Sequence, residues 1–149
     1  MEGKETGVPV LINLTSQASY QGYADEPIRV LTTGTLIPRG KDCLLKYTER
    51  TEDEQTGEIE EEQILLTLGK DQVTMNRTGA YANTMMFKKN RRFETSYRTP
   101  FGELPMAVFS RDVHCRLGEK EGTVHLKYEL SMQGNYTSTN ELHLVYAAN

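Results

Sequence analysis

Residues 93–108 read FETSYRTPFGELPMAV, and this stretch decides how the chain folds. Loop 99–102 has Pro100 at its second position and Gly102 at its fourth, which is typical of a type I turn. Residues that such a turn places opposite one another share a face of the resulting antiparallel pair. The predicted pairs are Arg98 with Glu103, Tyr97 with Leu104, Thr95 with Met106 and Phe93 with Val108. The loop and the apolar pattern give the same register, so we predict a β-hairpin.

Three further loops give matching faces when the segments around them are paired. These loops are 69–72, 89–90 and 133–135. Segment 58–69, EIEEEQILLTLG, is rich in helix formers, but its pairing around loop 69–72 favours a strand. The acidic segment 51–62 is expected to be a solvated loop leading into that strand. The predicted pairs are Leu68 with Val73, Leu66 with Met75, Ile64 with Arg77; Met86 with Phe93, Thr84 with Thr95, Ala82 with Tyr97; and Leu126 with Leu142, Val124 with Leu144, Lys127 with Glu141.

Alternation of apolar and polar residues continues along most of the chain and yields about ten strands. Such a series leaves two all-β architectures, a sandwich or a closed barrel. Short up-and-down connections favour a single closed antiparallel barrel of about eight to ten strands, spanning residues 1–149, with residues 1–7 as a flexible segment. Gly34 and Pro105 indicate bends or bulges, and a change of apolar phase indicates a bulge near residue 110.

Composition excludes several classes of protein. Hydrophobic residues make up 37% of the chain and charged residues 26%, which argues against both a membrane protein and a disordered one. The net charge of −4 argues against a general nucleic-acid binder. Residues 1–15 contain no secretory apolar run, so we expect a cytoplasmic protein with no membrane partner. Cys43 and Cys115 have no metal-site or redox spacing, and no disulfide is expected.

Three stretches carry a resemblance to a known family. They are VTMNRTGA at 73–80, ETSYRTPFGELPMAV at 94–108 and TTG at 32–34. With the late strand pair, they resemble the YwiB-like family of small bacterial proteins. The resemblance implies a calycin-like (lipocalin-like) closed barrel without an established biochemical activity. It implies no catalytic residue and no cofactor.

No catalytic or metal-binding motif can be assembled from the residues. Segment 34–41, GTLIPRGK, has the wrong glycine spacing for a P-loop, and Asp42 stands where Ser or Thr is needed. His114 and Cys115 are neighbours in a strand, so their side chains point to opposite faces and cannot act as a base and its nucleophile. His125 and His143 face each other across a predicted hairpin, but no third zinc ligand can be named.

A basic hairpin tip has two interpretations. Its cations could bind phosphate, RNA or an acidic partner, or they could simply keep an exposed turn solvated. We favour the second interpretation because no interleaved aromatic pattern suggests base stacking. The cations are Lys88, Lys89, Arg91 and Arg92.

Arg77 is the most informative residue, because its phase places it on the same face as Val73 and Met75. A guanidinium inside a barrel needs acceptors, either an acidic side chain or tyrosine of the protein, or the acidic head of a ligand. We expect a non-enzymatic barrel that binds a small amphipathic, acidic ligand in its interior. The alternative is a protein-interaction module whose interior is filled by side chains. The candidate ligand-binding residues are Arg77, Met86, Phe93, Thr95 and Tyr97.

Overall fold

The computed structural model describes residues 7–20, 22–52, 55–79, 82–99 and 102–149. These residues form strands and turns without a helix, so none of them belongs to a helix that could cross a membrane. The predicted flexible segment 1–7 lies outside the described residues except for Gly7. The strands are β1 (Val8–Tyr20), β2 (Tyr23–Ala24), β3 (Ile28–Arg39), β4 (Asp42–Glu52), β5 (Ile59–Leu68), β6 (Gln72–Arg77), β7 (Asn83–Lys88), β8 (Arg92–Thr99), β9 (Gly102–Arg116), β10 (Glu121–Met132) and β11 (Asn135–Ala148).

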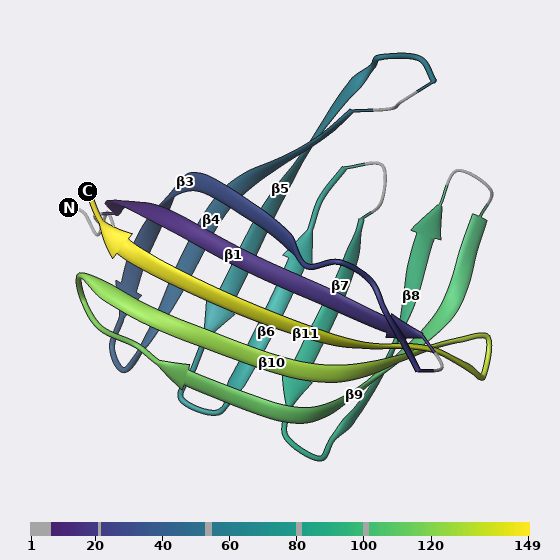
Figure 1. Cartoon of the computed structure of the whole chain (residues 1–149). Coiled ribbons are helices and arrows are strands. Elements are labelled where there is room, and N and C mark those ends of the chain that lie inside the picture. Colours follow the sequence, from purple (N-terminus) through teal and green to yellow (C-terminus); the bar gives the residue numbers. More distant parts are fainter. Residues whose placement is uncertain (1–6, 21, 53–54, 80–81, 100–101) are drawn as a thin grey trace.

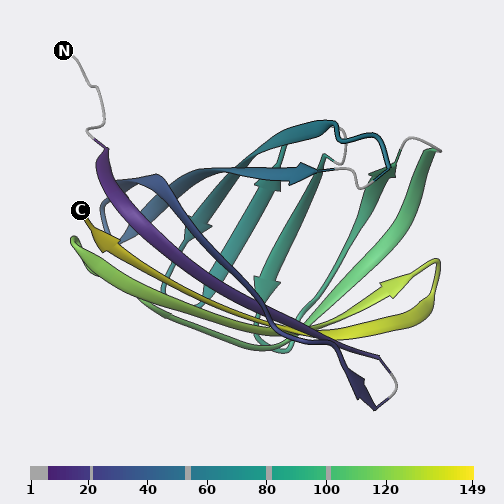
Figure 2. The same ribbon diagram turned by 45° about the horizontal axis from the view of Figure 1, so that its top comes forward.

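The described strands form one antiparallel sheet. Its strand order is β7-β6-β5-β4-β3-β1-β11-β10-β9-β8, and the short β2 pairs with β1 outside this path. The sheet curls until its two end strands, β7 and β8, lie next to each other, joined by a turn (Figures 1 and 2). The predicted all-β antiparallel barrel is therefore confirmed, as a barrel that is nearly closed.

Most of the predicted registers are also confirmed. Around loop 99–102 the pairs run from Phe93↔Val108 to Arg98↔Glu103, and the ladder continues to Thr99↔Gly102. The pairs around loops 69–72 and 133–135 are the predicted ones. The predicted type of the first turn depends on residues 100–101, which lie outside the described residues.

Bulges account for the remaining details of the ladders. The predicted bulge near residue 110 is at Arg111, because Lys127 pairs with Asp112 whereas the next residue, Tyr128, pairs with Ser110. The last turn is shorter than predicted, since a bulge after Leu130 allows Met132 to pair with Asn135. At Pro105 the expected irregularity is absent from the ladder with β8, where Pro105 pairs regularly with Ser96.

The predicted pairing of β7 with β8 was wrong. Among the described residues β7 pairs with β6 and β8 pairs with β9, so Met86 lies opposite Thr74, not Phe93. Thr84 lies opposite Asn76, and Ala82 precedes the strand. The turn between the two strands bonds instead to Ser110 at the β9 bulge. Asn90 N donates to Ser110 O (2.8 Å), and Ser110 N donates to Arg91 O (3.1 Å).

The closed half of the barrel is filled by side chains. Phe87, Leu45, Leu36, Leu68 and Tyr146 are each at most 1% exposed and pack together with residues from most of the other strands. Each large apolar side chain buried in this way stabilises the fold by about 1.5–3 kcal/mol. Alternation along β7 then places Met85 with Phe87 on the inner face and Met86 on the outer face.

The barrel wall divides between β3 and β4. The two strands pair only from Gly34↔Tyr47 to Arg39↔Asp42, although β3 pairs with β1 from Ile28 onward. Gly34 marks the point of divergence, where the backbones approach closely. A Cβ there would lie 2.4 Å from the carbonyl oxygen of Lys46, so only glycine fits. Beyond this point β4 and β5 rise together as an arm (Figure 1).

Candidate functional site

The open end of the barrel contains a cavity of about 320 Å³. Its apolar lining comes from inner-face residues of four strands: Leu14 of β1, Met75 of β6, Met85 of β7 and Leu142 of β11. Polar groups join this lining toward the rim, among them Ser16 and Asn140. The cavity thus combines an apolar interior with a polar edge, and its volume lies at the lower end of the range for small-molecule sites.

Arg77 lies in this cavity and is already neutralised by the protein. Its Nη1 atom donates to Glu49 Oε1 at 2.7 Å and to Glu62 Oε1 at 3.2 Å. The side chain of Glu62 is 8% exposed, that of Arg77 20% and that of Glu49 38%, so the cluster runs from the interior to the rim. Burial acts to lower the pKa of Arg77, but the bonds and charges of the two carboxylates outweigh it, so the pKa is raised.

These ion pairs change what the cavity can bind. The structure gives Arg77 the acidic partners that one sequence-based alternative required. One guanidinium between two carboxylates leaves an excess of negative charge, which repels a ligand carboxylate even though both bonds to Arg77 use only its Nη1 atom. The case for an acidic ligand is therefore weaker.

Two tyrosines supply neutral hydroxyl groups to the same cavity. Burial, with the nearby charge of Glu49, raises the pKa of Tyr47 to about 12. Burial also raises the pKa of Tyr128 to about 12, against a smaller opposing effect of Arg77. Its ring packs on Phe87 with centroids 4.8 Å apart. Both phenols therefore keep their protons at neutral pH and can donate or accept hydrogen bonds.

The five predicted ligand-binding residues do not gather at one site. Arg77 lines the mouth cavity, whereas Met86 lies on the outer face with its Sδ 3.5 Å from Gln72 Nε2. Met86 was therefore misplaced, because the phase of β7 is set by the buried Phe87. Phe93 and Met86 border a separate surface hollow of about 340 Å³. Thr95 is half-buried opposite Met106, and Tyr97 is placed only by its backbone pairing with Leu104.

The residues that sequence reasoning missed are Met85, Tyr47, Tyr128, Glu49 and Glu62. A signal for Glu62 was present, because it precedes Ile64 by two positions and so shares its inner face. The predicted solvated loop over 51–62 conceals this signal, and that prediction is wrong for the paired residues. In the structure, residues 51–52 and 59–62 are paired strand, and Glu49 lies directly opposite Glu62.

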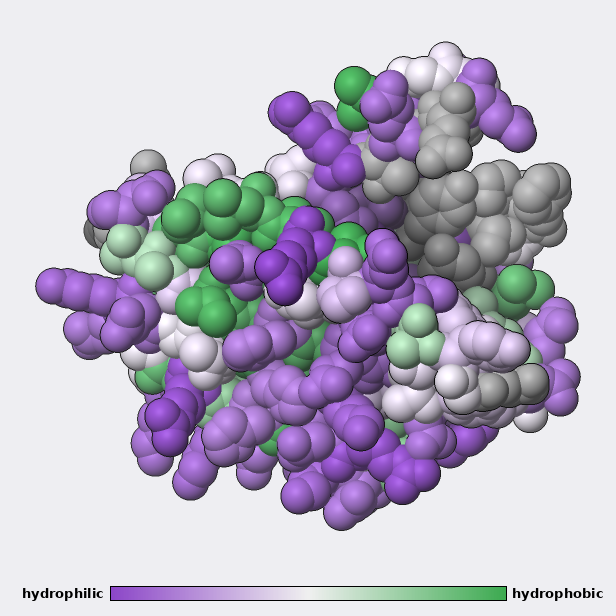
Figure 3. Space-filling view, viewed as in Figure 1, coloured by the Kyte–Doolittle hydropathy of each residue, from purple (hydrophilic) through white to green (hydrophobic). Residues whose placement is uncertain are grey.

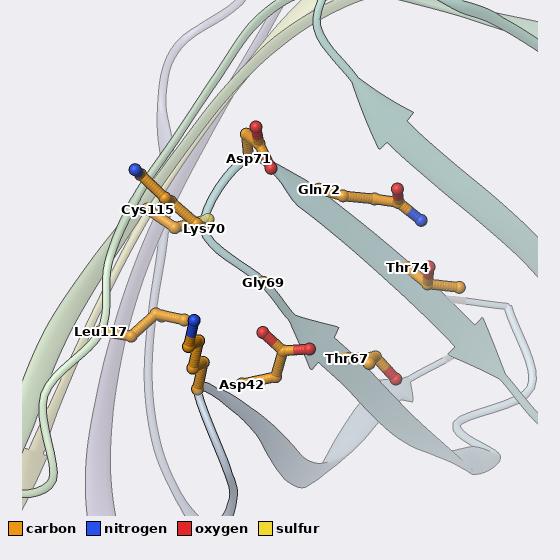
Figure 4. A pocket seen from close by; sticks show the side chains of 10 residues that line it. Asp42, Thr67, Gly69, Lys70, Asp71, Gln72, Thr74, Cys115 and Leu117 are labelled. Atoms are coloured by element: carbon orange, nitrogen blue, oxygen red, sulfur yellow. The ribbon is translucent and has the colours of Figure 1, made fainter.

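A second pocket, of about 570 Å³, lies at the closed end of the barrel. Figure 4 shows Cys115 and Leu117 on one side and Asp42, Thr67 and Thr74 on the other. Burial, with smaller effects of Cys43 and Asp71, raises the pKa of Cys115 to about 11. The thiol is therefore protonated at neutral pH and is a poor nucleophile.

The P-loop-like segment 34–41 ends β3 and enters the turn to β4.

Three histidines stand in a row across the outer face of adjacent strands. His125 on β10 pairs with His114 on β9 and with His143 on β11. His125 Nε2 lies 2.6 Å from Glu141 Oε2, and its ring centroid lies 6.1 Å from that of His143. Within the described part of the chain, however, no three His, Cys, Asp or Glu side chains are arranged to hold a metal ion.

The basic tip lies outside the mouth cavity and the closed-end pocket, but Lys88, Arg91 and Arg92 line the surface hollow that Met86 and Phe93 border. Lys88, Lys89, Arg91 and Arg92 are all exposed. Arg92 lies 3.7 Å from Glu94, an exposed pair that contributes little to stability. The geometry of the tip gives no reason to abandon the interpretation as a solvated turn.

Comparisons with known proteins identify relatives of unknown function. A family model described as "Domain of unknown function (DUF1934)" matches residues 12–144. The crystal structure of ywiB protein from Bacillus subtilis is similar with a TM-score of 0.80 and 19% sequence identity, covering 96% of this chain and 93% of that one. A protein of unknown function from Bacteroides ovatus has a TM-score of 0.37 and 13% identity, covering 96% of this chain and 41% of that one. None of the curated proteins matches the chain.

Proposed function

Because the chain belongs to the DUF1934 family, whose function is unknown, we propose a function from its geometry: it is a non-enzymatic barrel that binds a small amphipathic molecule at its mouth. The observation that carries this proposal is the cavity of about 320 Å³, in which inner-face methionines and leucines meet a polar rim. We also propose, as expected from the sequence, that the barrel is calycin-like and that the protein is cytoplasmic.

The charge of the cavity selects the head group of the ligand. Glu49 and Glu62 outnumber Arg77, and the phenols of Tyr47 and Tyr128 are neutral hydrogen-bonding groups. A hydroxyl head can bond to the two phenols and an ammonium head is attracted by the two carboxylates, whereas the same carboxylates repel a carboxylate head. We therefore propose a ligand with an apolar tail and a neutral or cationic head, in place of the acidic ligand expected from the sequence.

Uptake of a neutral fluorescent dye tests the proposal. Nile red is titrated into the protein and then displaced with decanol, decylamine or decanoic acid. We expect saturable uptake and displacement by the alcohol and the amine at concentrations well below those needed for the acid. Binding should weaken at least fivefold in Met85→Gln, which places an amide in the apolar lining.

Met86→Gln is the matched control, because Met86 follows Met85 in the same strand but faces outward. It should leave dye uptake unchanged. Absence of saturable uptake, or equal effects of the two substitutions, would contradict the proposal. The alternative is a protein-interaction module. The gap in the barrel wall between β3 and β4 is the observation that favours it.

A further inference from the structure

The gap between β3 and β4 leaves two strand edges unpaired. Among the described residues, 28–33 of β3 pair with β1 on one side only, and residues 48–52 of β4 pair only with β5. No other backbone hydrogen bond of the described chain reaches either stretch. Unpaired edges are templates for the addition of another strand, and soluble proteins usually shield them. Here two such edges border one cleft.

The cleft has a volume of about 880 Å³ and opens through the barrel wall. One side is formed by residues 30–35 of β3 and the other by residues 46–50 of β4. The free edge of β3 therefore borders the same cleft as the edge of β4. A second barrel would have to insert its own edge into this cleft, whereas a single extended segment needs only to enter it.

Apolar side chains in and beside the cleft lack a cover: Val30 lines the cleft, and Ile28, two residues earlier in β3, lines the adjoining mouth cavity. Val30 and Ile28 belong to the inner face, because they lie opposite Leu14 and Ser16 of β1. They are nevertheless 40% and 63% exposed, since no neighbouring strand covers them on the β4 side. The space-filling view shows apolar residues gathered on the side of the barrel formed by β1, β3 and β4 (Figure 3). An added strand with apolar residues at alternate positions would bury Val30 and Ile28.

The outer rim of the cleft is basic. Lys46 and Arg50 alternate along the outer face of β4, and Arg29 lies on the outer face of β3. Arg50 is paired with Glu61 at 2.6 Å, but no described carboxylate forms an ion pair with Lys46 or Arg29. The outward positions of an added strand would therefore meet unpaired cations, which favour acidic side chains.

We propose that the cleft between β3 and β4 binds an extended peptide of a partner protein, in which apolar and acidic residues alternate. The peptide pairs antiparallel with residues 28–33 of β3, since antiparallel pairing is the more stable arrangement. Its apolar side chains cover Val30 and Ile28, and its acidic side chains face Arg29 and Lys46. The peptide uses strand edges that the small molecule does not, although Leu14, Tyr47 and Glu49 line both the cleft and the mouth cavity.

The test uses the whole protein and a fluorescein-labelled peptide of about eight residues in which valine alternates with glutamate, an extended length of roughly 27 Å. Fluorescence anisotropy measures its affinity. Amide hydrogen exchange locates the bound strand, and we expect protection of residues 28–33. The same peptide with every valine N-methylated lacks the backbone N–H donors along one edge and should bind at least tenfold more weakly.

A charge exchange makes the proposal specific. Arg29→Glu with Lys46→Glu should weaken the valine–glutamate peptide about tenfold and strengthen a valine–lysine peptide. Both residues are exposed, so the double variant should stay folded. Arg116→Glu with Lys120→Glu makes the same change in net charge outside the cleft and should leave both affinities unchanged.

Three results would overturn the proposal. One is the absence of saturable binding, and the second is binding that is equally strong in the charge-exchanged protein. The third is protection of residues 28–33 that depends on protein concentration without any peptide, which would assign the edge to a second copy of this chain. Dye uptake at the mouth is measured separately, so failure of the peptide test does not decide the small-molecule proposal.

Discussion

Replacing Arg77 with Met should destabilise the barrel because it removes the cation that is bonded to a buried carboxylate. Arg77 is the cation bonded to Glu62 at 3.2 Å, and the side chain of Glu62 is only 8% exposed. Breaking a fully buried ion pair by removing one partner costs about 3–5 kcal/mol. Glu49 can turn toward water because its side chain is 38% exposed, so the penalty arises mainly from Glu62. We therefore expect a loss of about 2–3 kcal/mol at pH 7. The protein should remain folded, because domains of this size have about 5–15 kcal/mol of stability.

Urea unfolding of the wild type and Arg77→Met measures this loss as a shift of the midpoint. Arg50→Met is the matched control, since Arg50 forms a pair of similar chemistry with Glu61 whose side chains are 73% and 49% exposed. An exposed pair contributes about 0.2–1 kcal/mol, so the control should shift the midpoint far less. Adding Glu62→Gln to Arg77→Met removes the buried negative charge that no longer has its cation, and should restore more than half of the lost stability.

The reasoning is refuted if Arg77→Met and Arg50→Met are equally destabilised. Additive losses in the Arg77→Met/Glu62→Gln double variant would refute it as well.

Three other predictions follow from single features. Gly34→Ala should cost about 2 kcal/mol in urea unfolding, because its Cβ would lie 2.4 Å from the Lys46 carbonyl oxygen; an unchanged midpoint would show that β3 and β4 do not approach so closely. Gly102→Val should cost about 1–3 kcal/mol, since Gly102 has φ of +123°, yet it should leave Nile red uptake intact; lost uptake at unchanged stability would make the turn a binding loop. Changing the four cations of the basic tip to serine should preserve the melting temperature; these cations are Lys88, Lys89, Arg91 and Arg92. If the wild type binds RNA with a steep salt dependence and this variant does not, the tip is a functional surface.

A fifth prediction concerns alkaline pH. Burial raises the pKa of each of three tyrosines to about 12, from an ordinary value near 10. The stability that they contribute is fully present below pH 10 and is lost as the pH rises from 10 through 12. Burial also raises the pKa of Cys115, from 9.0 to about 11, so some stability is already lost above pH 9. The urea midpoint should therefore fall further as the pH rises above 10, and less so after Tyr→Phe substitution. A midpoint that stays steady through pH 11.5 would contradict these shifts. The tyrosines are Tyr47, Tyr128 and Tyr146.

The sequence by itself determined the hairpins and the faces of their strands. In a hairpin the loop brings the partners together, so the turn residues and a period of two specify the register locally. FETSYRTPFGELPMAV contained all that was needed to pair Phe93 with Val108 and Tyr97 with Leu104. The same reasoning placed Arg77 opposite Ile64 and thus on the inner face.

Only the tertiary structure decided where this local rule fails. A turn at Lys89–Asn90 looked like any other hairpin, but the bulge at Arg111 turns the backbone groups of Ser110 toward that turn, and β7 and β8 close the barrel without a ladder. The partners of Arg77 and the opening between β3 and β4 depend on how strands distant in sequence curve around a common core. The close approach at Gly34 ends one ladder, and no period-two pattern records that distance. Pairing within a hairpin is a local property of the chain, whereas closure of the barrel depends on packing among all of its strands.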